Sequence, residues 1–239
     1  MIHSWARSSE RNRARHAHQL LSVMIRKYND AEREYSVNNT KKNKSRSQML
    51  KPNVKTLTAV LNACAWPAES SERADSFAIA QLVMTELSSG TYGKPNFLSY
   101  AAYLAVCGTT LDAGPERDAE AERTFRDCIN AGEVGKIVLE KLYIAASPKL
   151  LHDLLGDHLD GSGQITIPSF WNRSIKGERA KGNALNTKVD DEVVSKIPKS
   201  FQERFSEVQN LSPTVVGNGD DEILWSKVEF SRGVKERLL

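Results

Sequence analysis

The chain has 239 residues, 40% of them hydrophobic and 26% charged, which is enough for one or two domains that bury a core. No apolar run approaches the roughly 18 residues of a membrane-spanning helix, so we expect no membrane partner. The three cysteines show no Cys-x-x-Cys spacing, and no Ser, His and Asp stand in a catalytic order. We therefore expect no metal, no cofactor and no enzymatic activity.

The formal net charge of +3 is unevenly distributed along the chain. Residues 1–56 carry a net charge of +9, residues 57–175 one of −6, and residues 176–239 are neutral overall. The basic part could attract a polyanion, whereas the acidic part could do so only if its carboxylates lie on the far face. The basic run at 41–46, K-K-N-K-S-R, is interpreted as a solvated loop, a non-specific phosphate contact or a nuclear localisation signal.

The first 51 residues are expected to hold one helix pair and an insertion. Residues 1–27 fit the end of one helix, a turn at 8–12 and a second helix. Residues 36–51 are polar, basic and without an apolar period, which predicts a mobile loop inserted into the first repeat.

Three further helix pairs are expected between residues 54 and 155. Their predicted ranges are 54–66 with 72–88, 97–109 with 116–131, and 133–146 with 148–155. Gly132 is expected to end a helix, and Pro148 to lie in the first turn of one. The second helix of each of the first three pairs carries an apolar ladder that begins with alanine; these ladders are Ala17, Leu21, Met24, then Ala80, Met84, Leu87, then Ala121, Phe125, Cys128.

The sequence changes character after Gly156, where glycines and Pro168 interrupt any helix. Residues 156–176 are predicted to form a capping segment, because the aromatic and isoleucine side chains of 165–175 need cover and should pack on the last helices. A run at 160–165, D-G-S-G-Q-I, is similar to half of a calcium-binding loop but is out of register, so we interpret it as a glycine-rich turn. Residues 177–239 are polar and aperiodic, which predicts a largely disordered C-terminal tail.

Two stretches that lie 43 residues apart are nearly the same. Residues 51–65 are K-P-N-V-K-T-L-T-A-V-L-N-A-C-A, and residues 94–108 are K-P-N-F-L-S-Y-A-A-Y-L-A-V-C-G. Proline stops the preceding segment and asparagine is a good helix cap. Residues 1–6 fit the same frame, with Trp5 at the position of Cys64 and Cys107. Such a period is typical of a protein built from stacked repeats.

This unit resembles the pentatricopeptide repeat family, whose repeats begin with Pro-Asn or Pro-Asp, a β-branched residue and Thr-Tyr-Asn. Residues 52–58, P-N-V-K-T-L-T, and 95–101, P-N-F-L-S-Y-A, carry the resemblance. It covers roughly residues 1–155 and implies an all-α fold, a right-handed α-α superhelix of helix-turn-helix repeats. A tetratricopeptide-type solenoid would need a Trp-x-x-Leu-Gly-x-x-Tyr run, which is absent; a plain helical bundle is the other alternative.

The resemblance also implies sequence-selective binding of single-stranded RNA, with one base contacted by each helix pair. The contacting residues would be the fifth of the first helix and the last of the repeat, which are Thr58 and Asn96 in the second repeat. In the family such a pair implies a preference for adenine. Ala101 takes the first of these places in the third repeat but has no hydrogen-bonding group, and the first repeat offers only Asn53.

Lys55 and Leu98 occupy the place where the family sandwiches the base, so Lys55 could reach a phosphate and Leu98 could only pack. By resemblance the protein would act in a mitochondrion or plastid, in RNA processing, stability or translation. Met1 aligns inside a first helix, which leads us to expect further repeats and a targeting peptide upstream of it. The alternative function is an α-solenoid scaffold that binds other proteins. The charge of the concave face discriminates the two functions, because RNA binding needs a basic face, whereas a scaffold can have an acidic one.

Overall fold

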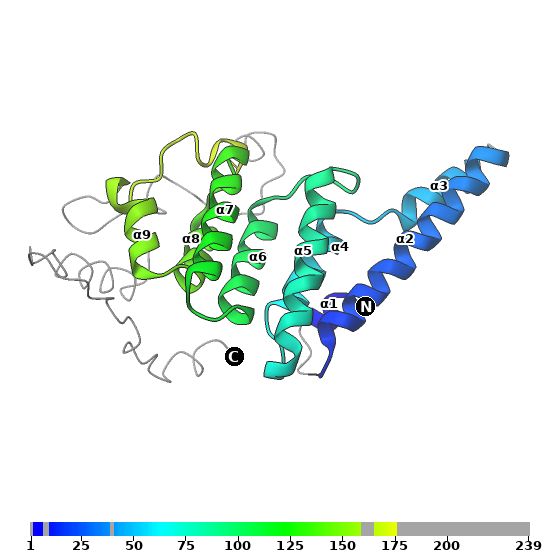
Figure 1. Ribbon diagram of the computed structural model, residues 1–239. Coiled ribbons are helices and arrows are strands. Elements are labelled where there is room, and N and C mark those ends of the chain that lie inside the picture. Colours follow the sequence, from blue (N-terminus) through cyan, green and yellow to red (C-terminus); the bar gives the residue numbers. More distant parts are fainter. Residues whose placement is uncertain (1, 7–9, 39–40, 159–164, 176–239) are drawn as a thin grey trace, which may run out of the picture.

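The computed structural model describes residues 2–6, 10–38, 41–158 and 165–175, and this part of the chain is all-α (Figure 1). Its only β feature is an isolated bridge residue at Ile165. The helices are α1 (Ile2–Ala6), α2 (Arg13–Asn38), α3 (Lys41–Leu50), α4 (Val54–Cys64), α5 (Arg73–Ser89), α6 (Phe97–Thr110), α7 (Pro115–Ala131), α8 (Lys136–Ala145) and α9 (Pro148–Leu155), with short 3₁₀ turns at Ser70–Glu72 and Gly156–His158.

The helices follow one another as pairs that pack in two layers (Figure 1). The first helix of each pair contacts the first helix of the next, so α1, α4, α6 and α8 form one layer. The second helices, α5 and α7, lie in front of this layer in Figure 1. The predicted helix pairs are confirmed from α4 to α9, with α8 beginning three residues later than expected.

The helix ends are set by the residues that the sequence marks for this purpose. Asn53 caps α4 by accepting from the backbone N–H of Thr56 at 3.0 Å. Asn96 caps α6 by accepting from Leu98 and Ser99, and Ser99 completes a reciprocal capping box. The left-handed Gly132, at a φ of 73°, ends α7 as predicted.

Small side chains hold the layers together. The alanines that begin the three apolar ladders are fully buried. Seven of the nine ladder residues are at most 3% exposed, and only the two methionines are partly exposed. Between α6 and α8, Gly108 faces Ile144 so closely that a Cβ on the glycine would lie 2.9 Å from the Ile144 Cγ2 atom. The first-helix layer is therefore packed nearly backbone to backbone at this point.

A buried carboxylate ties the first pair to the second. Glu72 accepts from the backbone N–H of Asn12 at 2.8 Å, and from that of Ala68 at 3.0 Å. Asn12 has a φ of 56°, which asparagine tolerates better than most residues. Burial raises the pKa of Glu72, but the backbone donors and Arg13 outweigh burial, so the pKa lies below its usual value.

The prediction of a loop at 36–51 is wrong, because α2 continues to Asn38 and Lys41–Leu50 form helix α3. The α3 helix packs along α2, and Ser47, which is buried, donates a hydrogen bond from its hydroxyl to Glu32. Lysine, arginine, glutamine and methionine have good intrinsic helix propensity. A polar sequence without an apolar period can therefore be helical where a neighbouring helix supports it.

The segment 165–175 packs on the last helices, as its apolar content predicts. Trp171 is 5% exposed and meets the ring of Phe125 on α7 edge to face, with ring centroids 5.6 Å apart. Its carbonyl accepts from the backbone N–H of Val134 at 2.8 Å, and the N–H of Ser174 donates to the carbonyl of Gly132 at 3.1 Å. This segment covers the end of α7 and the chain that leads to α8.

Two predictions concern residues outside the described part of the chain. These are the disordered tail at 177–239 and most of the glycine-rich turn at 160–165. Among the described residues, no helix combines the length and the apolar character needed to cross a bilayer.

Candidate functional site

A groove of about 380 Å³ runs across the first-helix layer. Its lining comes from α4, α6, α8 and the residues next to them, and none comes from α5 or α7. The lining residues are Lys55, Thr58, Ala59, Asn62, Ala65, Trp66, Asn96, Leu98, Ala101, Ala102, Ala105, Ile137 and Lys141.

The lining positions recur at the same offsets in successive helices. Lys55, Leu98 and Ile137 are each the second residue of their helix, in α4, α6 and α8 respectively. Thr58 and Ala101 are each the fifth residue. Offsets of three and four place residues on one face of a helix. The groove is thus a repeated helix face, presented side by side by consecutive pairs.

Hydrogen bonds join Thr58 to Asn96 through Ser99. The Ser99 hydroxyl donates to the Asn96 Oδ1 atom at 3.1 Å, and the hydroxyls of Thr58 and Ser99 lie 2.8 Å apart. A hydroxyl has one hydrogen to donate. The bond between the hydroxyls of Thr58 and Ser99 can run in either direction, and the Thr58 oxygen keeps a lone pair in both arrangements. The Oδ1 atom of Asn96 is occupied by the helix cap, which leaves its Nδ2 atom as a donor.

The floor of the groove consists of alanines. Ala101, Ala102 and Ala105 of α6 are at most 5% exposed, and Ala59 of α4 is fully buried. Larger side chains at these positions would fill the hollow, so the small residues of the repeat create the groove as well as the close packing. They add no hydrogen-bonding group, which agrees with the expectation for Ala101.

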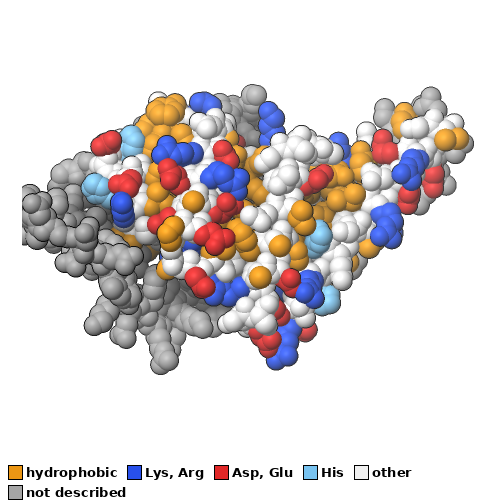
Figure 2. All heavy atoms as spheres, viewed as in Figure 1, with side chains coloured by type: hydrophobic (Ala, Val, Ile, Leu, Met, Phe, Trp, Pro, Cys, Tyr) orange, Lys and Arg blue, Asp and Glu red, His pale blue; other side chains and the backbone are white. Residues whose placement is uncertain are grey.

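The described residues give the groove a positive charge. Among them, Lys55 and Lys141 are the only charged residues that line it, and no carboxylate does. The acidic residues of this part of the chain are numerous on α7 instead, and Figure 2, which views the molecule from the side of α5 and α7, shows red side chains over that helix. Residues 57–175 could attract a polyanion only if their carboxylates lay away from the candidate site. The carboxylates of α7 meet this condition.

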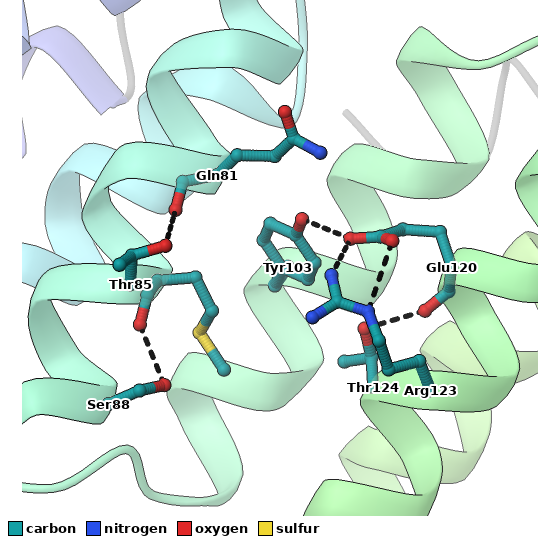
Figure 3. Close-up of polar contacts among 8 residues, drawn as sticks. Gln81, Thr85, Ser88, Tyr103, Glu120, Arg123 and Thr124 are labelled. Carbon is teal, nitrogen blue, oxygen red and sulfur yellow. Dashed lines mark hydrogen bonds and ion pairs between the residues drawn. The ribbon is translucent and has the colours of Figure 1, made fainter.

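Two of the carboxylates on α7 form ion pairs with neighbouring arginines. Glu120 accepts from the hydroxyl of Tyr103 and pairs with Arg123, as Figure 3 shows, and Glu122 pairs with Arg126 at 2.7 Å. Burial, followed by the bond to Glu120, raises the pKa of Tyr103 well above its usual value, so this tyrosine remains a donor.

Two arginines of the basic N-terminal segment also form ion pairs with carboxylates. Arg11 lies 2.5 Å from Glu69, and Arg15 pairs with Asp75. Neither arginine lines the groove. These two arginines are therefore held in ion pairs outside the groove.

Of the six site residues predicted from sequence, five come together in the groove; they are Lys55, Thr58, Asn96, Leu98 and Ala101. Asn53 is exposed, caps α4 and is not among the lining residues.

Sequence reasoning missed Asn62, Trp66, Ile137 and Lys141. Aligning α8 with α6 from the true helix starts would have found Ile137 and Lys141, which match Leu98 and Ala102.

Side chains that can ligate a metal or act as nucleophiles are also present among the described residues. No group of three or more His, Cys, Asp or Glu side chains among them could hold a metal ion. The three cysteines are fully buried, and burial raises the pKa of Cys64 and that of Cys107 to about 12, so neither thiol is ionised near neutral pH.

Comparison of the chain with family models, with curated proteins and with solved structures finds no match. The pentatricopeptide resemblance therefore rests on the repeat itself.

Proposed function

We propose that the protein binds single-stranded RNA along the groove of the first-helix layer, as a right-handed superhelix of pentatricopeptide-like repeats. The observation that carries the proposal is the lining of the groove. Polar, apolar and cationic side chains from consecutive repeats meet there, and none of the described lining residues is a carboxylate. A concave, positive surface is what a polyanion requires. By resemblance the RNA would be a mitochondrial or plastid transcript, and the protein would bind it without catalysing a reaction.

The pair formed by Thr58 and Asn96 suits one class of base edge. The Thr58 oxygen accepts and the Asn96 Nδ2 atom donates, which complements an edge with an amino donor beside a ring-nitrogen acceptor. Adenine and cytosine have such an edge, whereas guanine and uracil present a carbonyl beside an N–H. The adenine preference implied by the family resemblance falls within this class.

Lys55 supplies the second kind of contact. It is exposed at the start of α4, one turn before Thr58, and it lines the same groove. A lysine contact to phosphate adds affinity without reading sequence, and screening by salt weakens it. Leu98, the matching residue of α6, is 42% exposed and could pack against a base.

One observation favours a second candidate function, an α-solenoid scaffold for protein partners. Trp66, Leu98 and Ile137 line the groove and are each 41–42% exposed, which would suit the apolar side chains of a peptide. The absence of carboxylates from the lining favours RNA over this alternative.

The test is a fluorescence-anisotropy titration with short RNA homopolymers at two salt concentrations. Asn96→Asp retains the capping oxygen but exchanges a donor for an acceptor, so it should shift preference from adenine towards uracil or guanine. Thr58→Val removes the hydroxyl at similar volume and should reduce base discrimination more than total binding. A base-edge contact is worth about 1–3 kcal/mol by analogy with DNA.

Lys55→Gln should act in the opposite way, weakening binding to every homopolymer alike. Thr85→Val on the exposed side of α5 is the matched control for Thr58→Val. If the wild-type protein binds no RNA at low salt, the proposal fails. If RNA binds but neither Thr58→Val nor Asn96→Asp changes the base preference, these two residues are not the ones that read the base.

A further inference from the structure

A tryptophan and a lysine meet across the groove at a place that the base-reading pair does not use. Trp66 follows the end of α4 and Lys141 is on α8, yet the Lys141 Nζ atom lies 5.9 Å from the centroid of the Trp66 ring. The helix between them, α6, contributes alanines to the groove, including Ala102 and Ala105. Small side chains on α6 thus leave the indole and the ammonium group free to approach each other.

The Trp66 side chain is poorly explained by packing alone. It is 41% exposed, whereas Trp171 is only 5% exposed. The 5.9 Å contact is at the limit of about 6 Å for a cation–π interaction, so Lys141 holds the ring weakly. An indole that is exposed in a concave site without carboxylates has a face available to a flat ligand.

We propose that Trp66 is a stacking platform for a nucleobase and that Lys141 binds a phosphate beside that base. This inference rests on the proposed RNA-binding function and adds a second contact to it. Stacking on an aromatic side chain tolerates any base, because every base has a π-face. The Trp66 contact therefore supplies affinity, while Thr58 and Asn96 supply selectivity.

The positive charge of the groove favours a nucleic-acid strand over a peptide as its ligand. A peptide could use the apolar surface of Trp66, but only an acidic peptide would also pair with the two lysines, which are the charged residues of the described lining. A nucleic-acid strand provides both flat rings and regularly spaced phosphates, and Lys55 and Lys141 lie on different helices of the same groove, α4 and α8. A strand that crosses the helix layer would meet one lysine after the other.

The experiment compares Trp66→Ala, Trp66→Phe and Lys141→Gln with the wild-type protein, using oligo(A) and oligo(U) of about ten nucleotides. Loss of one stacked base should weaken binding about 5- to 150-fold for Trp66→Ala, and equally for both RNAs. Trp66→Phe retains a stacking ring and should recover most of this loss. Intrinsic tryptophan fluorescence should be quenched by RNA in the wild type and less so in Trp66→Phe.

Lys141→Gln should weaken binding to both RNAs. It should also make the negative slope of log affinity against log salt less steep by about 0.7, the value for one phosphate contact on a single strand. Phe170→Ala is the matched control, since it removes an aromatic ring that is 54% exposed and outside the groove. Circular dichroism establishes that each variant is folded.

The outcomes separate the two proposals. If the wild-type protein binds neither RNA, the proposed function fails, and this inference fails with it. If RNA binds and Asn96→Asp changes the base preference while Trp66→Ala binds as tightly as the wild type, the stacking platform alone is refuted. A Trp66→Ala loss that differs between oligo(A) and oligo(U) by as much as the total effect would also refute it, because stacking should be sequence-tolerant.

Discussion

Replacing Gly108 with alanine sets two physical effects against each other. The residue lies in α6, where glycine costs about 1 kcal/mol relative to alanine, so helix propensity predicts that the change stabilises the protein. The structure predicts the reverse. An added Cβ atom would lie 2.9 Å from the Ile144 Cγ2 atom and 3.0 Å from the Ile144 carbonyl oxygen.

Neither of these Ile144 atoms can easily give way. The Cγ2 atom is one bond from the Ile144 Cβ atom, and the carbonyl belongs to the backbone of α8. Relief therefore requires α8 to move away from α6, and overpacking of this kind costs about 1–3 kcal/mol. We expect Gly108→Ala to lower the free energy of unfolding by about 1 kcal/mol after the gain in propensity is subtracted.

The assay is urea unfolding followed by circular dichroism at the helix band. Ser88→Ala, at an exposed position of α5, is the control and should stay within about 0.5 kcal/mol of the wild type. Adding Ile144→Ala removes the Cγ2 clash but leaves the carbonyl, so the double variant should lose less than the two single losses combined. If Gly108→Ala is more stable than the wild type, the close approach of α6 and α8 described above is wrong.

Three other predictions concern stability and reactivity. Trp171→Ala should lower the free energy of unfolding by about 3 kcal/mol in the same assay, because it empties the space against α7. The pKa of Glu72 is lowered in the fold, so this carboxylate stabilises the folded state at any pH above the unfolded carboxyl pKa near about 4.3. This stabilisation is lost as the pH falls through the lower folded pKa. Acid unfolding should therefore depend less steeply on pH in Glu72→Gln. Burial raises the pKa of Cys64 and Cys107 to about 12, so a thiol reagent at pH 8 should label no cysteine until denaturant is added.

The helix pairs from α4 to α7 could be predicted from the sequence because each repeat marks its own boundaries. Pro-Asn precedes both first helices, and Asn53 and Asn96 act as the caps that this pattern indicates. The same caps could not reveal that Asn96 is linked to Thr58, since the link passes through the Ser99 hydroxyl, and the place of Ser99 in the repeat pattern does not show that it contacts the preceding repeat. Local signals thus predict helix ends better than they predict contacts between repeats.

The start of α8 could not be predicted, for a reason that lies in distant residues. The sequence predicts a helix from Glu133, but α8 begins at Lys136. The Glu133 carboxylate accepts from the backbone N–H of Phe97 at 3.0 Å, and the N–H of Val134 donates to the carbonyl of Trp171. These long-range bonds hold the chain out of the helix, and the three-residue shift concealed the alignment of Lys141 with the groove residues of α6.

The arrangement of charge gives a last prediction about the proposed RNA interface. The net charge of −6 over residues 57–175 would seem to oppose RNA, yet Glu116 and Asp127 lie on α7, in the other helix layer, and do not line the groove. Packed helix axes are about 8–10 Å apart, which matches the screening length of about 8 Å at physiological ionic strength. The repulsion between these carboxylates and a strand in the groove should therefore be small in such a buffer.

At an ionic strength of 0.01 M the screening length rises to about 30 Å, and carboxylates on the far layer should be felt in the groove. Glu116→Gln combined with Asp127→Asn should then strengthen RNA binding at low salt and leave it nearly unchanged at physiological salt, as measured by anisotropy at both concentrations. An equal gain at both salt concentrations would mean that these side chains contact the RNA directly. That result would place the strand on the α7 side and contradict the assignment of the groove.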